Sequence, residues 1–147
     1  MKIHRSIEIG APGKQIWPFL VEPEKIMKWF TFLKKFEYTG KQRSGVGTAF
    51  YYEEKSGPQL MKLNYEVTEW VENKRLIFVL TSGPLKKDSQ VWSLEVIASG
   101  SRFTMTEEVV ITRGIIDSII TPILKGMIGK NIEKIQRNLK ELIEVQQ

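Results

Sequence analysis

The sequence predicts an α+β fold in which one long C-terminal helix covers an antiparallel sheet. Residues 33–112 contain successive segments of strand character joined by short turns, and short connections between strands give antiparallel neighbours. Residues 115–145 carry apolar side chains at helical spacing, with charged side chains between them. One face of such a sheet must be covered, and this helix is the predicted element long enough to cover it.

The elements before the long helix follow from their periodicity. Residues 2–9 alternate polar and apolar side chains, as a half-buried strand does. Two short helices are predicted next, one at 14–21 and one that starts at residues 22–24, where Pro23 suits a first helical turn. Six more strands are predicted at 33–39, 48–54, 60–71, 75–81, 89–98 and 102–112, separated by turns rich in Gly, Ser and Asn.

The long helix has irregularities that leave two interpretations open. Its apolar positions before Ile128 centre on a different face from those after it, and Gly126 and Gly129 narrow the helix where the change occurs. Either the helix bends around the core, or space is left beside its backbone for a ligand. Pro122 removes a backbone donor, so it could also be the first position of the helix, with residues 114–120 forming a separate turn.

The overall composition predicts a single domain over residues 1–147 in a cytoplasmic protein. A chain of 147 residues with 41% hydrophobic and 27% charged residues can build one substantial core. The alternating N-terminus does not have the pattern of a signal peptide. The most apolar window, residues 115–128, is too short to span a bilayer and contains Asp117 and Lys125, so no stable membrane insertion is expected.

Several classes of chemistry are not expected. The chain has no cysteine and one histidine, His4, so disulfides, thiol chemistry, a metal site and a histidine-based triad are not expected. No phosphate-binding loop or dinucleotide fingerprint is present, so no cofactor is expected. The net charge of +5 comes from scattered lysines and arginines rather than a basic stripe, so nucleic acid is not an expected partner.

The most specific pattern lies near the N-terminus and is extended by features further along. These are the run Ile9-Gly10-Ala11-Pro12-Gly13-Lys14-Gln15-Ile16-Trp17, then Glu22-Pro23-Glu24 and Trp29, then Gly45 and Gly47, and finally Leu139-Lys140. Over nearly the whole chain the sequence resembles the START-like, or SRPBCC, superfamily. That group includes birch-pollen-allergen-like proteins, START lipid-binding domains and polyketide cyclase/dehydrase-like proteins.

The resemblance implies a helix-grip fold. In that fold a curved seven-stranded antiparallel sheet wraps around the long C-terminal helix, two short helices follow the first strand, and an apolar cavity lies between sheet and helix. The resemblance does not imply one function, because the group contains both binding proteins and enzymes.

The lining of such a cavity follows from strand alternation and from the apolar side of the helix. The expected ligand-binding residues are Met61, Leu63 and Tyr65; Trp92 and Leu94; Phe103, Met105 and Glu107; and Leu124, Met127 and Ile128. The alternative is a closed core packed with the same side chains.

Two of these residues are polar groups on an apolar face. Glu107 and Tyr65 are therefore the candidate catalytic residues, although no catalytic residue is assigned. A buried Glu107 would need a partner or would stay protonated, and the alternative is that it pairs with a lysine or arginine at the sheet edge.

The expected function is binding or carriage of a small hydrophobic ligand, such as a lipid, an isoprenoid or a polyketide-like compound. The missing catalytic constellations favour a non-catalytic protein. Two alternatives stay open: a polyketide cyclase/dehydratase-like enzyme that uses a cavity carboxylate, and a protein-interaction module of the chaperone-activator type, as the resemblance implies. A monomer or weak homodimer is expected.

Overall fold

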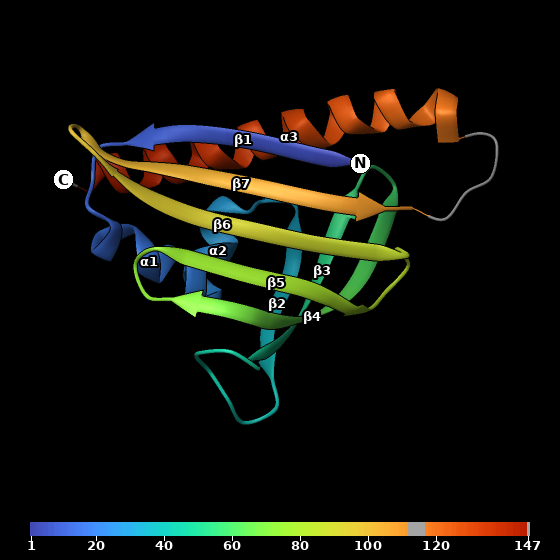
Figure 1. Ribbon diagram of the computed structural model, residues 1–147, viewed down its shortest axis with the longest axis horizontal. Coiled ribbons are helices and arrows are strands. Elements are labelled where there is room, and N and C mark those ends of the chain that lie inside the picture. Colours follow the sequence, from blue (N-terminus) through green and yellow to red (C-terminus); the bar gives the residue numbers. More distant parts are fainter. Residues whose placement is uncertain (112–116, 147) are drawn as a thin grey trace.

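A curved antiparallel sheet, two short helices and one long helix make up the protein in the computed structural model, which describes residues 1–111 and 117–146 (Figure 1). The elements are β1 (Lys2–Ile9), α1 (Gly13–Val21), α2 (Pro23–Trp29), β2 (Leu33–Thr39), β3 (Ala49–Ser56), β4 (Gln59–Val71), β5 (Arg75–Ser82), β6 (Lys87–Ile97), β7 (Gly100–Val110) and α3 (Asp117–Val145). The predicted α+β helix-grip fold is thereby confirmed.

The sheet has seven strands in the order β1-β7-β6-β5-β4-β3-β2, all antiparallel to their neighbours. Strands β2 to β7 follow one another as hairpins, as their short connections predict. β1 pairs with β7 instead of β2, with Ile3 opposite Glu107, so the chain crosses from one edge of the sheet to the other through α1 and α2. In Figure 1, α3 runs alongside β1 and β7, and α1 and α2 lie together at one end of the sheet.

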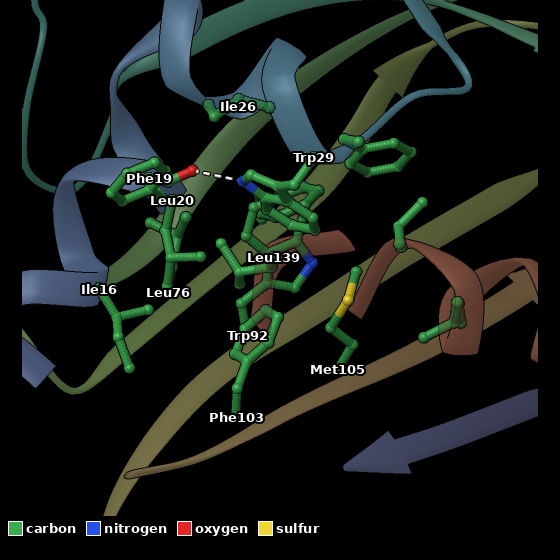
Figure 2. Packing of buried hydrophobic residues seen from close by; sticks show 14 of the residues in the cluster. Ile16, Phe19, Leu20, Ile26, Trp29, Leu76, Trp92, Phe103, Met105 and Leu139 are labelled. Atoms are coloured by element: carbon green, nitrogen blue, oxygen red, sulfur yellow. Dashed lines mark hydrogen bonds between the residues drawn. The ribbon is translucent and has the colours of Figure 1, made fainter. Parts of the chain in front are cut away.

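The core at that end is built from aromatic side chains. Trp29, at the end of α2, lies 5.4 Å from Trp92 of β6 and 5.9 Å from Phe103 of β7, measured between ring centroids. Its indole Nε1 donates a 2.7 Å hydrogen bond to the Phe19 carbonyl, which ties α2 to α1 (Figure 2). Leu139 of α3 packs into the same cluster and is fully buried. Edge-to-face aromatic pairs of this kind add about 0.5–1.5 kcal/mol each beyond their area burial.

The long helix is continuous through Pro122, from Asp117 to Val145. The interpretation that the helix starts at Pro122, after a separate turn, is therefore wrong for the described residues. Proline removes one backbone donor from the helix. Ile120 and Leu124, which are four residues apart on either side of Pro122, nevertheless line the same cavity, as residues on one face of an uninterrupted helix do. The predicted helical residues 115 and 116 lie outside the described residues.

One hairpin turn requires glycine. Gly100, at the start of β7, has a φ of 142°, and a Cβ at this position would lie 2.3 Å from the carbonyl oxygen of Ile9. Neither condition suits a residue with a side chain. The close approach brings the end of β1 against the β6–β7 turn.

Candidate ligand-binding site

A cavity of about 480 Å³ lies between the sheet and the first half of α3. Its wall is formed by β3, β4, β6 and β7 on the sheet side and by α3 from Ile120 to Ile135 on the helix side. Phe30 and Phe32, after α2, and Leu85, before β6, close parts of the remaining wall. The volume falls within the range of about 300–1,000 Å³ that is usual for small-molecule sites.

Eight of the side chains expected from the sequence lie on this wall. They are Met61, Leu63, Tyr65, Met105, Glu107, Leu124, Met127 and Ile128. The sheet residues come from alternating positions of β4 and β7, as the two-residue period of a strand requires. The methionines give the wall a flexible and polarisable surface that adapts to irregular apolar shapes.

The other three expected residues, Trp92, Leu94 and Phe103, lie in the packed core and are absent from the described lining of the cavity. The strand register explains the difference. Trp92 pairs with Met105 and Leu94 with Phe103, so moving from Glu107 toward the β6–β7 turn leads out of the cavity and into the aromatic core. These side chains have the inward orientation that alternation predicts, but Trp29 and α3 already fill the space in front of them.

Two polar wall residues, Asp88 and Gln90, were not expected. The sixth strand is predicted to start at residue 89, whereas β6 begins at Lys87. Strand alternation counted backwards from Trp92 puts both Gln90 and Asp88 on the inward face. That signal was available in the sequence, but the polar character of the segment concealed it.

Glu54 on β3 was missed for a similar reason. It shares the inward face with Phe50 and Tyr52, both of which are buried. Because Glu54 is charged and ends the predicted strand, its pattern is also typical of a solvent-facing strand end. In the structure its side chain is half-buried and lies on the cavity wall.

Buried hydrogen bonds hold the polar part of the wall in place. Tyr52 Oη donates to Tyr65 Oη at 3.1 Å, and Tyr65 Oη donates to Asp88 Oδ2 at 2.5 Å. Gln90 Nε2 donates to both Asp88 Oδ2 and Tyr52 Oη at 3.3 Å. Trp92 Nε1 donates to Gln90 Oε1 at 3.1 Å, which fixes the orientation of the Gln90 amide. The hydrogen bonds of this network therefore converge on Asp88 Oδ2, which accepts from Tyr65 and Gln90.

Asp88 is satisfied on one oxygen. The residue is 4% exposed, and its Oδ2 accepts hydrogen bonds from Tyr65 and Gln90. Its Oδ1 accepts none from the N–H and hydroxyl groups of the described residues. When one of the two acids holds a proton, Asp88 also shares a hydrogen bond with the carboxyl group of Glu107.

Burial and mutual repulsion raise the pKa values of the other two carboxyl groups. Burial raises the pKa of Glu107 well above its usual range, and the charge of Asp88, a hydrogen bond to Asp88 and the charge of Glu54 act in the same direction. Burial, followed by the charge of Asp88, raises the pKa of Glu54 to about 7. Both side chains are half-buried and line the cavity. Both carboxyl groups therefore keep a proton to higher pH than a carboxyl group in water does.

The two tyrosines of the network remain hydrogen-bond donors throughout the physiological pH range. Burial is the largest cause that raises the pKa of Tyr52 and that of Tyr65 well above the usual value of a phenol. Among the described residues no group of three or more histidine, cysteine or carboxylate side chains is placed to hold a metal ion. The polar groups of this wall can donate and accept hydrogen bonds, and its carboxyl groups can take up and release protons.

Apolar side chains are exposed around the cavity. Ile120 and Met127 of α3 line it and also reach solvent, as does Val110 at the end of β7. An apolar rim of this kind suits the passage of an apolar molecule.

The chain belongs to the family described as polyketide cyclase / dehydrase and lipid transport, which matches residues 1–144. This family falls within the START-like superfamily, so the resemblance predicted from the sequence is confirmed. Among curated proteins, none matches the sequence of this chain. Within residues 1–111 and 117–146, no helix combines the length and apolar character needed to cross a bilayer.

Solved structures share the fold at low sequence identity. A protein from Thermus thermophilus, TTHA0849, has a TM-score of 0.85 at 16% identity, covering 99% of this chain and 98% of that one. A START superfamily protein from Mycobacterium smegmatis has a TM-score of 0.83 at 15% identity and 99% coverage of both chains. The Zhui aromatase/cyclase from Streptomyces sp. R1128 has a TM-score of 0.81 at 11% identity, covering 98% of this chain and 93% of that one.

Proposed function

We propose that the protein binds a small hydrophobic molecule of lipid, isoprenoid or polyketide-like character and carries or presents it without converting it. The cavity of about 480 Å³ is the observation that carries this proposal. Methionine, leucine and isoleucine side chains form most of the wall contributed by α3, and the carboxyl groups come from β3, β6 and β7. Such a division suits a ligand with a large apolar part and a small polar group.

Blocking the cavity tests this proposal. Leu124 is half-buried on the cavity wall, whereas its neighbour Ile123 is 68% exposed on the same helix. Leu124→Trp should place an indole in the cavity, and Ile123→Trp adds the same group outside it. The neutral fluorophore N-phenyl-1-naphthylamine is a suitable probe, because its fluorescence rises in apolar surroundings.

The wild-type protein should bind this probe saturably with one site per chain. Leu124→Trp should weaken binding about tenfold or more, equivalent to about 1.4 kcal/mol, while Ile123→Trp should change it less than twofold. Native mass spectrometry of freshly purified protein, followed by extraction, can then identify a ligand that copurifies. Equal binding by the two variants, or no binding by the wild-type protein, would contradict the proposal.

The position of Glu107 favours a second candidate, an enzyme that moves protons at a bound carbonyl compound. Glu107 lies on the cavity wall, is hydrogen-bonded to Asp88, and has a raised pKa that suits a general acid or base. Tyr65 donates to Asp88 on the same wall. The protein-interaction alternative remains a prediction.

Hydrogen–deuterium exchange at the acidic carbon of ethyl 3-oxooctanoate, followed by NMR, tests the enzyme candidate. An enzyme should accelerate exchange above the buffer rate, and Glu107→Gln should remove about 10² of that acceleration or more while leaving probe affinity nearly unchanged. The neighbouring Glu108 is exposed on the other face of the same strand, so Glu108→Gln is the matched control. Exchange at the buffer rate in the wild-type protein would remove this candidate.

A further inference from the structure

We infer that the ligand of this cavity carries a basic nitrogen and binds as an ammonium ion, with its charge beside Asp88 and its apolar part under the first half of α3. This inference rests on the proposed function, because it assigns the polar group of the same hydrophobic ligand. It follows from the charges on the wall, the unpaired oxygen of Asp88 and the way in which Asp88 is held.

The described wall of the cavity carries acids without basic side chains. Three carboxyl groups reach it, from Glu54 on β3, Asp88 on β6 and Glu107 on β7, and no lysine, arginine or histidine of the described residues lines it. The α-amino group of Met1 also lies on the wall, where it donates a 2.7 Å hydrogen bond to the Val109 carbonyl. Buried negative charge is costly unless it is paired, so a positive counter-charge bound in the cavity would stabilise the ionised carboxyl groups.

The unpaired oxygen of Asp88 gives the position of that counter-charge. Asp88 is 4% exposed and lines the cavity, and its Oδ1 receives no hydrogen bond from an N–H or hydroxyl group of the described residues. An ammonium ion has N–H donors and no acceptor, so it satisfies such an oxygen and supplies the missing positive charge together.

The buried network holds Asp88 ready for this role. Tyr65 and Gln90 both donate to Oδ2, which anchors the carboxylate from one side. Trp92 in turn holds the Gln90 amide. Because these donors engage Oδ2, a ligand donor at Oδ1 leaves both of them in place and competes with the proton that Asp88 shares with Glu107.

Glu107 couples ligand charge to protonation. Its carboxyl is hydrogen-bonded to that of Asp88, and two carboxyl groups can share such a bond when one of them holds a proton. An ammonium ion beside the pair favours the ionised forms of Glu107 and Glu54, so protons should leave the protein when the amine binds. A neutral ligand brings no charge and should release no protons.

The chemistry of the wall discriminates between ligand head groups. A carboxylate ligand would add a fourth acid to a site without basic side chains among its described residues, which is unfavourable. An alcohol can donate one hydrogen bond to Asp88 Oδ1 but leaves the negative charge unpaired. A protonated amine supplies both the hydrogen bond and the positive charge. For ligands of equal chain length, affinity should therefore decrease from amine to alcohol to acid.

Titration calorimetry with n-decylamine, 1-decanol and decanoate tests this order, because the three probes share one chain and differ in the head group. At pH 7, and below the concentrations at which the probes aggregate, decylamine should bind at least tenfold more tightly than decanol, and decanoate most weakly. Repeating the decylamine titration in two buffers with different protonation enthalpies measures the number of protons released, which should be above zero.

Substitutions test whether Asp88 is responsible for the preference for decylamine. Asp88→Asn retains the shape and an acceptor for Tyr65 and Gln90 but removes the charge, so it should weaken decylamine binding at least tenfold and change decanol binding less than threefold. Glu108→Gln, on the solvent-exposed face of β7, should change neither. If a thermal scan shows that Asp88→Asn does not fold, Glu107→Gln serves instead and should abolish most of the proton release.

The outcomes separate this inference from the proposed function. If decanol binds and decylamine binds no better, the amine inference is overturned while hydrophobic ligand binding stands. The inference is also overturned if decylamine binds more tightly but Asp88→Asn leaves that preference intact. If none of the three probes binds, both proposals fail.

Discussion

The two halves of α3 have the same apolar spacing but different surroundings. In the second half the inward side chains are almost fully buried, and in the first half apolar side chains remain accessible. The exposed fractions are 7% for Ile132, 2% for Ile135 and 0% for Leu139 and Ile143, against 39% for Ile120, 68% for Ile123 and 47% for Met127. Leu139 and Ile143 therefore pack in the core, Ile132 and Ile135 belong to both the core and the cavity wall, and the first half of the helix covers the cavity.

Polar contacts reinforce the difference by tying the second half to β1 and α2. Gln136 Nε2 donates to the Arg5 carbonyl at 2.9 Å, and Lys140 Nζ donates to the Glu8 carbonyl at 2.7 Å. Asn138 Nδ2 donates to the Trp29 carbonyl at 3.2 Å. Anchored in this way, one end of the helix holds the other above the sheet, so a single element supplies both stability and a binding site.

Truncating one side chain in each half should give the largest contrast. Leu139→Ala should lower the free energy of unfolding by about 2–5 kcal/mol, because it leaves a void in a core that packs Leu139 on every side. Ile123→Ala should change it by about 0.5 kcal/mol or less, since this side chain is mostly exposed. Urea denaturation measures both values. Losses of equal size would show that the first half is packed as tightly as the second.

The acids below the first half should make stability depend on pH. A carboxyl group whose pKa is about 7 in the folded state and 4.5 otherwise holds more protons when folded, so stability falls as pH rises through this window. For Glu54 the full loss is on the order of 3 kcal/mol and is complete above pH 7. Glu54→Gln should therefore gain stability relative to the wild-type protein between pH 5 and pH 8.

The comparison of variant and wild-type protein is needed because other acids act in the opposite direction. Hydrogen bonds from Arg75 and Lys140 lower the pKa values of Glu69 and Glu144, so their contributions are lost as the pH falls. Urea denaturation of both proteins at each pH cancels these shared terms. The exposed Glu66 provides the control variant, Glu66→Gln. Parallel pH profiles for Glu54→Gln and the wild-type protein would show that Glu54 is well solvated.

The two glycines of the helix should give the smallest effect. A Cβ on Gly126 would meet no atom within 4 Å, so Gly126→Ala should stabilise the protein by about 0.5–1 kcal/mol through helix propensity. A Cβ on Gly129 would lie 2.3 Å from Arg5 Nη2, so the guanidinium must move and Gly129→Ala should gain less. Thermal unfolding ranks the two variants. A larger gain at Gly129 would mean that Arg5 does not pack over the helix as described.

The sequence by itself determined the elements and the face that most side chains take. Strand alternation placed Leu63, Tyr65, Met105 and Glu107 on the inward face, and helical spacing gave the apolar side of α3. These patterns are readable because they arise from the local geometry of each element, with a period of two in strands and 3.6 in helices. The same periodicity applied to β6 also points Asp88 and Gln90 inward once the true start of that strand is known.

The tertiary structure alone decided where inward-facing side chains meet a packed core and where they meet empty space. Trp92 and Met105 are paired across β6 and β7, yet Met105 lines the cavity and Trp92 packs against Trp29. It also decided that Tyr65 and Gln90 hold one oxygen of Asp88, while no N–H or hydroxyl group of the described residues donates to the other. Local periodicity fixes the direction of a side chain but not the separation between helix and sheet, which depends on contacts between residues far apart in the chain.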